Sequence, residues 1–389
     1  MSQHVTSAAS EAAAGTGSAL RGGPAAWFGR FARWVTEDKR ATYGASALRI
    51  LFALSMLTIT ASSFFDRHYL WGIASTWVDP EVRQRGWWAP FTWFFPKDNA
   101  VLFDLSYGVL LALIILFLIG WKTRYVTPVL LLFWMGLVTN STVLTNGGDT
   151  ITRIVLLFMI FADLSRHWSV DAWLRKRSGR EPHPLVFFGK LSVPAWLRNT
   201  LHNVAVMLAG YQIILVYVNS GIYKLMGEEW RDGSAFYYSL VLDVFRSFPV
   251  LNDLAWQSTL FVQVATWLSV WVQVLFPLLL LWTPTRRFAI LFIMSMHFGI
   301  GVFQGLWSFS LVMLGCDLLF VRDRSWRYAG TLLRNVWRRL VAFFRRSGAE
   351  PAGAAGGRAP EPETRPAVDR DPAPDAGTGT APESAAAGV

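Results

Sequence analysis

The sequence predicts an all-α polytopic membrane protein, a bundle of about eight transmembrane helices. First, 53% of the residues are apolar and 15% are aromatic, whereas a soluble domain averages about 45–50% apolar with glycine counted. Second, the apolar residues form blocks, and most blocks reach the length of about 20 residues that a helix needs to cross a bilayer. Third, basic residues gather beside alternate ends of these blocks. A multi-pass protein of the cell membrane is therefore expected.

The apolar blocks place the spans along the chain. We expect spans at residues 43–64, 101–119, 126–145, 149–164, 202–225, 258–282, 287–304 and 306–321. The fourth and eighth have only about 16 residues, just below the usual range of about 17–25. Each is compatible with a tilted helix in a thin part of the fold, or with a helix that extends into its polar neighbours.

The distribution of Lys and Arg assigns the two sides of the membrane, because cytoplasmic loops carry an excess of these residues. With the N-terminus inside, few basic residues fall in outside loops, namely Arg67, Arg83, Arg85, Lys97, Arg231 and Arg246. If one of the short spans did not cross the membrane, loops rich in Lys and Arg and loops poor in them would fall on the same side. The sequence therefore predicts that both termini are cytoplasmic.

The segments that flank the spans differ in composition. Residues 1–40 form a polar cytoplasmic N-terminal segment without the short apolar region of a cleavable signal peptide, and residues 41–325 form the transmembrane domain. The mixture of arginines and apolar residues at 326–346 predicts a basic amphipathic helix, which either lies on an anionic leaflet or packs against the bundle. A second interfacial helix is expected at residues 168–177. Residues 347–389 are rich in Ala, Pro and Gly and are expected to be a disordered tail. Membrane lipid is thus a predicted partner.

Composition excludes several classes of function. The net charge of +10 comes from residues beside the spans, without the basic and aromatic pattern of a nucleic-acid interface, so no nucleic-acid partner is expected. Cys316 is the single cysteine, which excludes an internal disulfide and indicates a packing residue. The six histidines are scattered without metal-ligand spacing, so we predict no metal site.

Lys224 is the most informative single residue. It lies at the outer end of an apolar stretch, residues 202–225, that is otherwise free of charge. An ionisable residue at membrane depth marks a functional site by default, and a desolvated amine can act as a base. The alternative is a lysine that snorkels to the interface, as lysines at helix ends often do.

The predicted fifth span carries a face that includes Lys224. Gly210, Ile214, Tyr217 and Gly221 recur at helical spacing with Lys224 and share its side of the helix. Small residues on such a face allow another helix or a ligand to approach closely. Ser220, one turn below, is placed to hydrogen-bond the amine.

Other polar residues are candidates of lower weight. His297 and Gln304 share a face of the predicted seventh span, although His297 is equally compatible with a buried core histidine. Asp149 is placed to cap the fourth span and to pair with Arg153. Two further aspartates near the inner ends of spans are interpreted as structural. Asp163 is expected to pair with Arg166, and Asp317 with Arg322.

The two long outside loops, residues 65–100 and 226–257, are dense in aromatic residues. Indole and phenol rings favour the headgroup zone, so a simple interfacial belt is one interpretation. The other is a cap over a lipid-accessible cavity whose flat apolar walls suit an aromatic or isoprenoid ligand. In the second case Trp230 is the expected neighbour of Lys224.

Residues 220–233, SGIYKLMGEEWRDG, resemble the G-x-x-K-L-(D)-x-x-W-x-x-G element of the HTTM family, the horizontally transferred transmembrane domain shared with vitamin K-dependent gamma-carboxylases. Supporting matches are LRI at residues 48–50, GWKTR at 120–124, NGGD at 146–149, MHFGIG at 296–301 and FSLVM at 309–313. The resemblance covers about residues 40–325. Members of this shape also look like the membrane protein of the sporulation-delaying toxin operon, which is needed to mature a secreted peptide.

The resemblance implies a specific role for Lys224. In the carboxylases the matching lysine is taken to be the base that deprotonates vitamin K hydroquinone on the luminal side, which implies a quinol cofactor. This chain has NGGD at residues 146–149 where the carboxylases have an Asn-His pair, and a basic helix and a disordered tail are expected where they continue into a large luminal substrate domain. Full gamma-carboxylation of protein glutamates is therefore not expected.

Two hypotheses of different class remain open. In the first, the protein is a membrane-embedded enzyme-like module acting on a quinol, lipid or secreted peptide. Lys224 and His297 are then catalytic, and the residues that bind the cofactor are Tyr217, Gly221, Trp230 and Gln304. In the second, it is a non-enzymatic maturation partner that presents its outside loops to a secreted peptide or protein. A transporter is less favoured, because charge within the spans is sparse.

Overall fold

The computed structural model describes residues 24–77, 89–179, 186–187 and 191–347. The chain divides into two compact units, Met1–Leu332 and Leu333–Val389. The predicted disordered tail, residues 347–389, lies outside the described residues from residue 348 onward, as do residues 1–23 of the N-terminal segment.

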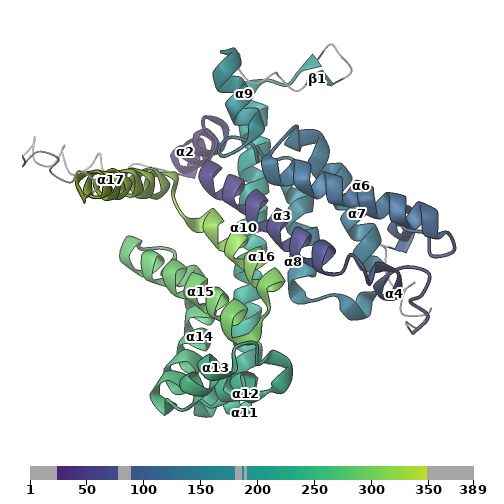
Figure 1. Cartoon of the computed structure of the whole chain (residues 1–389). Helices are drawn as coiled ribbons and strands as arrows, with labels where there is room; N and C mark the ends of the chain where they lie inside the picture. The colour runs from purple at the N-terminus through teal and green to yellow at the C-terminus, as the bar shows by residue number, and fades with distance from the viewer. Residues whose placement is uncertain (1–23, 78–88, 180–185, 188–190, 348–389) are drawn as a thin grey trace, which may run out of the picture. The chain divides into compact units, whose positions relative to one another are not determined.

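Helices dominate the described residues, and Figure 1 shows their order. The longer helices are α2 (Pro24–Thr36), α3 (Thr42–Ser62), α6 (Ala100–Ile119), α7 (Thr123–Thr139), α8 (Gly147–Met159), α9 (Val170–Ser178), α10 (Ala195–Met226), α14 (Thr259–Leu279), α15 (Thr283–Gln304), α16 (Trp307–Asp317) and α17 (Asp323–Ser347). The shorter ones are α4 (Arg67–Leu70), α11 (Glu228–Asp232), α12 (Ala235–Val241) and α13 (Pro249–Trp256), together with 3₁₀ helices at Ala89–Phe94, Thr142–Leu144, Asp243–Phe245 and Leu318–Phe320. Two two-residue strands, β1 (Val186–Phe187) and β2 (Leu191–Ser192), pair antiparallel.

The all-α membrane class is confirmed in its coarse form. Five described helices are long and apolar enough to cross a membrane, namely α3, α6, α10, α14 and α15. Two shorter apolar segments, Thr123–Thr139 and Trp307–Phe320, coincide with the predicted third and eighth spans. Where we predicted the fourth span at 149–164, α8 has only 13 residues. The number of eight spans and the side of the termini stay predictions.

Lipid contact explains the outward surface of these helices. The most apolar window of α6 has a mean hydropathy of 2.5, yet only 28% of it is buried within the protein. Leucine and valine side chains exposed on such a helix would be unfavourable in water and are favourable in hydrocarbon. The apolar outer face of α6 therefore indicates a lipid-facing helix.

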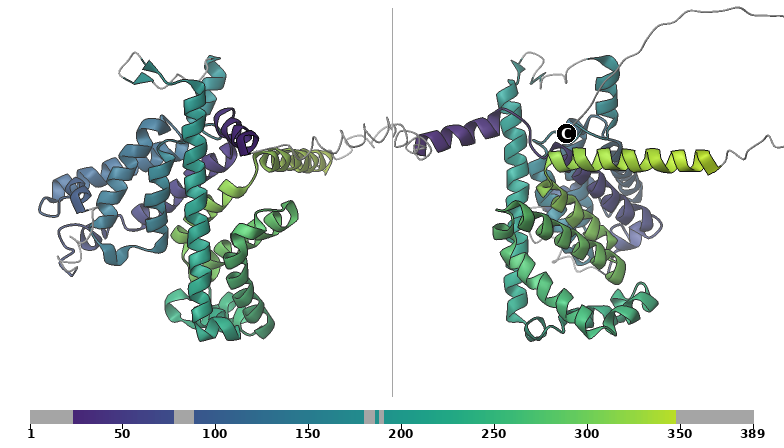
Figure 2. Two further views of the ribbon diagram at one scale, coloured as in Figure 1. Left: turned by 180° about the vertical axis from the view of Figure 1, so that it is seen from behind. Right: turned by 90° about the vertical axis from the view of Figure 1, so that its left-hand side faces the viewer.

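Helix α10 is the longest described element, with 32 residues. It packs against α8 on one side and α14 on the other, and both views of Figure 2 show it as one long helix beside these neighbours. Helix α16 packs against α3, α8 and α15. A Cβ atom on Gly44 of α3 would lie 2.5 Å from the backbone oxygen of Leu318, so glycine is required for this close approach.

The side chain of Arg49 is fully buried in α3 and closes the end of α6. Its guanidinium donates to the carbonyl oxygens of Phe117 at 2.9 Å, Leu118 at 2.7 Å and Trp168 at 2.6 Å. The last carbonyls of a helix lack intrahelical donors, and an arginine satisfies them well. Gly120 ends α6 with a φ of +72°, and a Cβ there would lie 2.2 Å from Nη1 of Arg49. Two of the motifs, LRI and GWKTR, therefore meet in one structural junction.

Polar side chains of α10 hold the segment that precedes α3. Asn199 donates to the carbonyls of Thr36 and Glu37, and Asn203 donates to those of Val35 and Asp38. These bonds connect the C-terminal end of α2 to the start of α10. Helix α2 itself, inside the segment predicted to be polar, carries exposed aromatic residues that the sequence analysis did not single out: Trp27, Phe28, Phe31 and Trp34.

The prediction that Asp163 pairs with Arg166 is wrong. Asp163 pairs with Lys39 at 2.6 Å, and its backbone N–H donates to Nδ1 of His202 at 2.9 Å. Since Nδ1 accepts, the other ring nitrogen carries the proton and donates to the carbonyl of Arg40 at 2.8 Å. His202 is thus a structural bridge between the start of α3, the end of α8 and α10.

The cap of α8 also differs from the prediction. Asn146 is the N-cap residue, and Asp149 completes a capping box by accepting from the backbone N–H of Asn146 at 2.9 Å. Arg153 donates to Thr150 rather than to the carboxylate of Asp149. The NGGD sequence is therefore a helix start to whose cap Asp149 contributes, as expected, but the N-cap residue is Asn146.

Helices α9 and α17 occupy the two segments predicted to be amphipathic. Helix α9 exposes Trp173 and Leu174 beside its basic residues. Helix α17 begins at Asp323, whose carboxylate accepts from the backbone N–H groups of Thr42 and Tyr43 at the start of α3. Further along, α17 exposes a stripe of apolar side chains among its arginines: Tyr328, Leu332, Leu333, Val336, Trp337 and Leu340.

Candidate functional site

Lys224 lies in the last turn of α10, half-buried against α14. Its amine donates to Oε1 of Gln273 at 3.0 Å and lies 4.6 Å from the ring centroid of Trp230. The expected bond to Ser220 is replaced by the bond to Gln273. An amide oxygen and an indole face both attract an ammonium group, so these contacts hold the amine of Lys224 in a fixed position.

The glycines of the SGIYKLMGEEWRDG segment explain how Lys224 is held. A Cβ on Gly221 would lie 2.6 Å from Cγ2 of Val274, so glycine lets α10 approach α14. A Cβ on Gly227 would lie 2.9 Å from the ring of Trp230, which folds back over the lysine. Gly233 ends α11 with a φ of +89° and packs on the indole of Trp267 in α14. The segment therefore fixes the C-terminal end of α10 against the middle of α14.

Tyr217 lies two turns before Lys224 and joins two further polar side chains. Its hydroxyl donates to Oδ1 of Asp317 in a very short hydrogen bond and lies 3.0 Å from Nε2 of His297. The three side chains come from α10, α15 and α16, and each is at most 2% exposed. Polar residues buried together among apolar helices are costly unless they are paired, and in membrane spans they mark functional sites. We call these residues the buried triad.

The buried triad has unsatisfied atoms. Nδ1 of His297 and Oδ2 of Asp317 are buried without a hydrogen-bond partner among the described residues. Most buried polar atoms in folded proteins are paired, so two orphans in one cluster are unusual. The expected pairing of Asp317 with Arg322 is wrong, because the carboxylate faces Tyr217 instead.

Sequence reasoning missed two members of this region. Gln273 was not considered, although it is a lone amide in a long apolar helix, and such an amide needs a partner. Asp317 was interpreted as structural because it lies near the end of a span. Its position at the end of an otherwise apolar helix, α16, was the signal that it faces other polar groups rather than water.

The structure brings together some predicted site residues and separates others. Lys224 and Trp230 are in contact, and Tyr217 contacts His297. Gln304, at the C-terminal end of α15, has no hydrogen bond to Lys224 or His297 among the described residues. Gly221 is buried against α14 and faces no open space.

These residues do not fit a quinol on the predicted face. Tyr217 is 1% exposed, with the ring of Phe276 in α14 packed edge-on at a centroid distance of 5.0 Å. Val274 fills the space beside Gly221. The face expected to receive a quinol ring is thus covered by α14. In the part of the chain that the structure describes, no group of three His, Cys, Asp or Glu side chains is placed to hold a metal ion.

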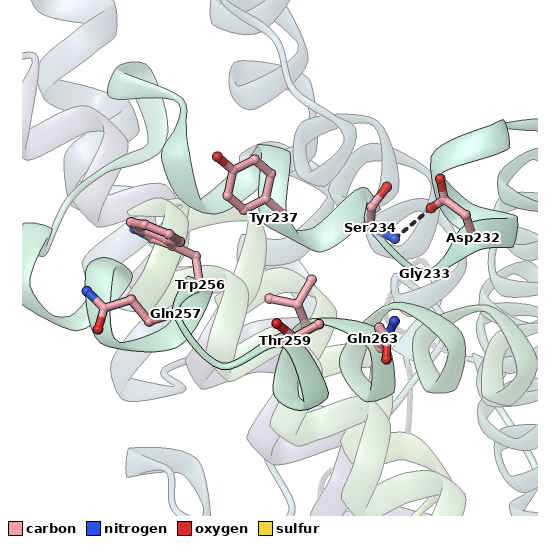
Figure 3. A pocket seen from close by; sticks show the side chains of 9 residues that line it. Asp232, Gly233, Ser234, Tyr237, Trp256, Gln257, Thr259 and Gln263 are labelled. Carbon is pink, nitrogen blue, oxygen red and sulfur yellow. Dashed lines mark hydrogen bonds between the residues drawn. The ribbon is translucent and has the colours of Figure 1, made fainter.

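An open pocket lies between α12 and the start of α14, beyond the end of α10. Its volume is about 350 Å³, and Figure 3 shows the side chains around it. Lys224 is not among its lining residues, which are Asp232, Gly233, Ser234, Tyr237, Trp256, Gln257, Thr259, Val262 and Gln263. All of them belong to α11, α12, α13, α14 or the turns between these helices. The second predicted aromatic loop is therefore a small helical layer with a pocket.

Comparison with known proteins identifies the family. The model of the HTTM domain matches residues 40–326. The chain is 24% identical over 233 residues to the protein YitO of Bacillus subtilis, covering 58% of this chain and 69% of that protein. It is 21% identical over 278 residues to the sporulation-delaying protein SdpB of the same organism, covering 67% of this chain and 78% of that protein. No solved structure matches the chain. The chain belongs to the HTTM domain family.

Proposed function

We propose that this protein is an enzyme-like module of the cell membrane that acts on a lipid or a secreted peptide at the outer side, with Lys224 as base. The proposal includes eight spans, cytoplasmic termini and contact of α9 and α17 with anionic lipid. One observation carries it: Lys224 is fixed between Gln273 and Trp230, on the same helix as Tyr217 of the buried triad. Ionisable groups so placed are rare in membrane spans and are functional as a rule.

The arrangement supports a proton-transfer role. A base at Lys224 takes a proton from its substrate, and the ammonium that forms is stabilised by the Gln273 oxygen and the Trp230 ring face. The buried triad, whose Tyr217 lies two turns before Lys224 on α10, supplies the hydroxyl, imidazole and carboxyl groups of a proton path. Because the face expected for a quinol is covered, no step is assigned to a quinol.

A second candidate function is that of a non-enzymatic maturation partner for a secreted peptide. Two observations favour it. The contacts of Lys224 stabilise its charged form, which suits a fixed cation that binds an anionic group. In addition, the chain is similar to a sporulation-delaying protein, SdpB. In this case Lys224 binds a partner and transfers no proton.

Substitution of Lys224 separates the two candidate functions. In a strain that lacks the gene, secreted peptides and membrane lipids would be quantified by mass spectrometry, and the species restored by the wild-type gene would serve as the readout. Lys224→Met is expected to lower that species at least about 100-fold, the usual contribution of a general base. Lys224→Arg is expected to be equally inactive, since a guanidinium does not lose its proton.

The control is Arg287→Met, which changes an exposed basic residue near the start of α15. It should leave the readout unchanged. Activity retained by Lys224→Arg, together with loss in Lys224→Met, would refute the base and support the maturation partner. Full activity of both Lys224 variants would refute both candidates.

A further inference from the structure

The pocket beyond the end of α10 has the chemistry of a cation site. Asp232 lies at one end in Figure 3 and Trp256 at the other, with Tyr237 between them along the upper wall. None of the nine lining residues is basic. A carboxylate at one end and aromatic rings at the other suit a ligand that carries an ammonium group close to an apolar group. The volume of about 350 Å³ lies in the range of small-molecule and side-chain sites.

The carboxylate of Asp232 is oriented and stays ionised. It accepts a hydrogen bond from the backbone N–H of Ser234 at 2.8 Å, which fixes its position in the turn at Gly233. Hydrogen bonds from the side chain and the backbone of Ser234 lower the pKa of Asp232. Since the carboxyl group is exposed, it remains available to a ligand. It therefore presents a negative charge throughout the neutral and mildly acidic range.

The aromatic end of the pocket is also held in place. The rings of Tyr237 and Trp256 pack edge to face, with centroids 5.9 Å apart and an interplanar angle of 81°. The indole N–H of Trp256 donates to Asp253 at 3.1 Å, and Asp253 in turn pairs with Arg246. The two rings are partly exposed. They offer a preformed apolar surface at the opposite end from Asp232.

The charge of the surrounding segment agrees with a cationic ligand. Residues 227–257 contain five acidic and two basic residues. One of the two, Arg246, is already paired with Asp253. Complementary charge steers an oppositely charged ligand toward such a surface. A peptide that carries a positive charge is thus attracted to this layer, whereas an acidic peptide is repelled.

We propose that this pocket binds a peptide segment in which an amino group lies next to a large apolar side chain. The amino group pairs with Asp232, and the apolar side chain lies on Tyr237 and Trp256. This site is separate from Lys224 and goes beyond the proposed function. It gives the protein a means to select a basic peptide whether or not Lys224 transfers a proton.

Binding of a short peptide to the purified protein tests the site. The full-length protein in maltoside detergent would be titrated with Ala-Lys-Phe-Ala, blocked at both termini, by isothermal calorimetry at low salt. Saturable binding is expected, and acetylation of the lysine should weaken it about two- to fivefold, the value of an exposed ion pair. Asp232→Asn should weaken the unmodified peptide to the same degree, because the amide retains the bond to Ser234 but carries no charge.

The matched control is Asp243→Asn, which removes an exposed charge from the same layer outside the pocket. It should bind the peptide like the wild type. Equal weakening by Asp232→Asn and Asp243→Asn would overturn the proposal in favour of general surface charge. Lack of saturable binding up to about 1 mM would also overturn it. If a short-chain phosphocholine lipid binds more tightly than the peptide, and Asp232→Asn weakens its binding, the ligand is a lipid headgroup and the peptide proposal is overturned. None of these results depends on the Lys224 experiment.

Discussion

Replacing Arg49 by Met is expected to destabilise the protein by about 3 kcal/mol or more. Three carbonyl oxygens, two at the end of α6 and one just before α9, lose their donor, and each buried unsatisfied group costs about 1–3 kcal/mol. The flexible methionine fills most of the volume, so the effect reports lost hydrogen bonds rather than a cavity. Thermal unfolding of the detergent-solubilised protein, followed by circular dichroism, measures the change.

Two further variants define the cause. Arg287→Met changes an exposed arginine near the start of α15 and should leave the unfolding temperature unchanged. Gly120→Ala should destabilise the same junction from the other side, because its Cβ would collide with the Arg49 guanidinium and its φ is positive. If Arg49→Met unfolds at the wild-type temperature, the buried guanidinium is not a structural requirement.

The second large effect is expected in the buried triad. Tyr217→Phe removes the hydroxyl that joins His297 to Asp317, and we expect it to lower the readout defined for Lys224 by about 100-fold, as for loss of an acid–base group. Asp317→Asn should act similarly, since its side chain accepts the tyrosine bond but carries no exchangeable acid proton. The amounts of folded protein in the membrane would be measured in parallel.

Tyr107→Phe is the matched control for this prediction. Tyr107 is a buried tyrosine of α6 whose hydroxyl donates to the carbonyl of Thr60 at 2.7 Å. Its loss should cost about 1 kcal/mol of stability and leave the readout intact. If the Tyr107 and Tyr217 variants lose activity equally, or if Tyr217→Phe is fully active, the buried triad has no functional role beyond packing.

Hydropathy was sufficient to predict most of the helices. The predicted first span, 43–64, corresponds to α3 at Thr42–Ser62, and the predicted second, 101–119, to α6 at Ala100–Ile119. These ends are sharp in the sequence because Asn99 caps the start of α6 and Gly120 ends it. Helix α10 begins at Ala195, earlier than the predicted residue 202. Hydropathy did not include its first turns because they contain polar residues, which contact α2.

Contacts between helices were beyond a single sequence. Two of the three aspartates expected to pair with a nearby arginine find distant partners instead, Asp163 with Lys39 and Asp317 with Tyr217. Proximity along the chain does not determine a partner, because the rotation of each helix is set by packing over its whole length. The pairing of Lys224 with Gln273 was missed for the same reason. Its contact with Trp230 was predicted, because both residues lie in one short segment.

The sidedness of the membrane is the claim on which the Lys224 site depends. Single cysteines would be introduced at exposed Glu229, five residues after Lys224, and at exposed Arg287 near the start of α15, after replacing the buried Cys316 by Ser. A membrane-impermeant maleimide should label the Glu229→Cys protein in intact cells and the Arg287→Cys protein only after permeabilisation. Labelling of Arg287→Cys alone in intact cells would place Lys224 on the cytoplasmic side and contradict the proposed chemistry.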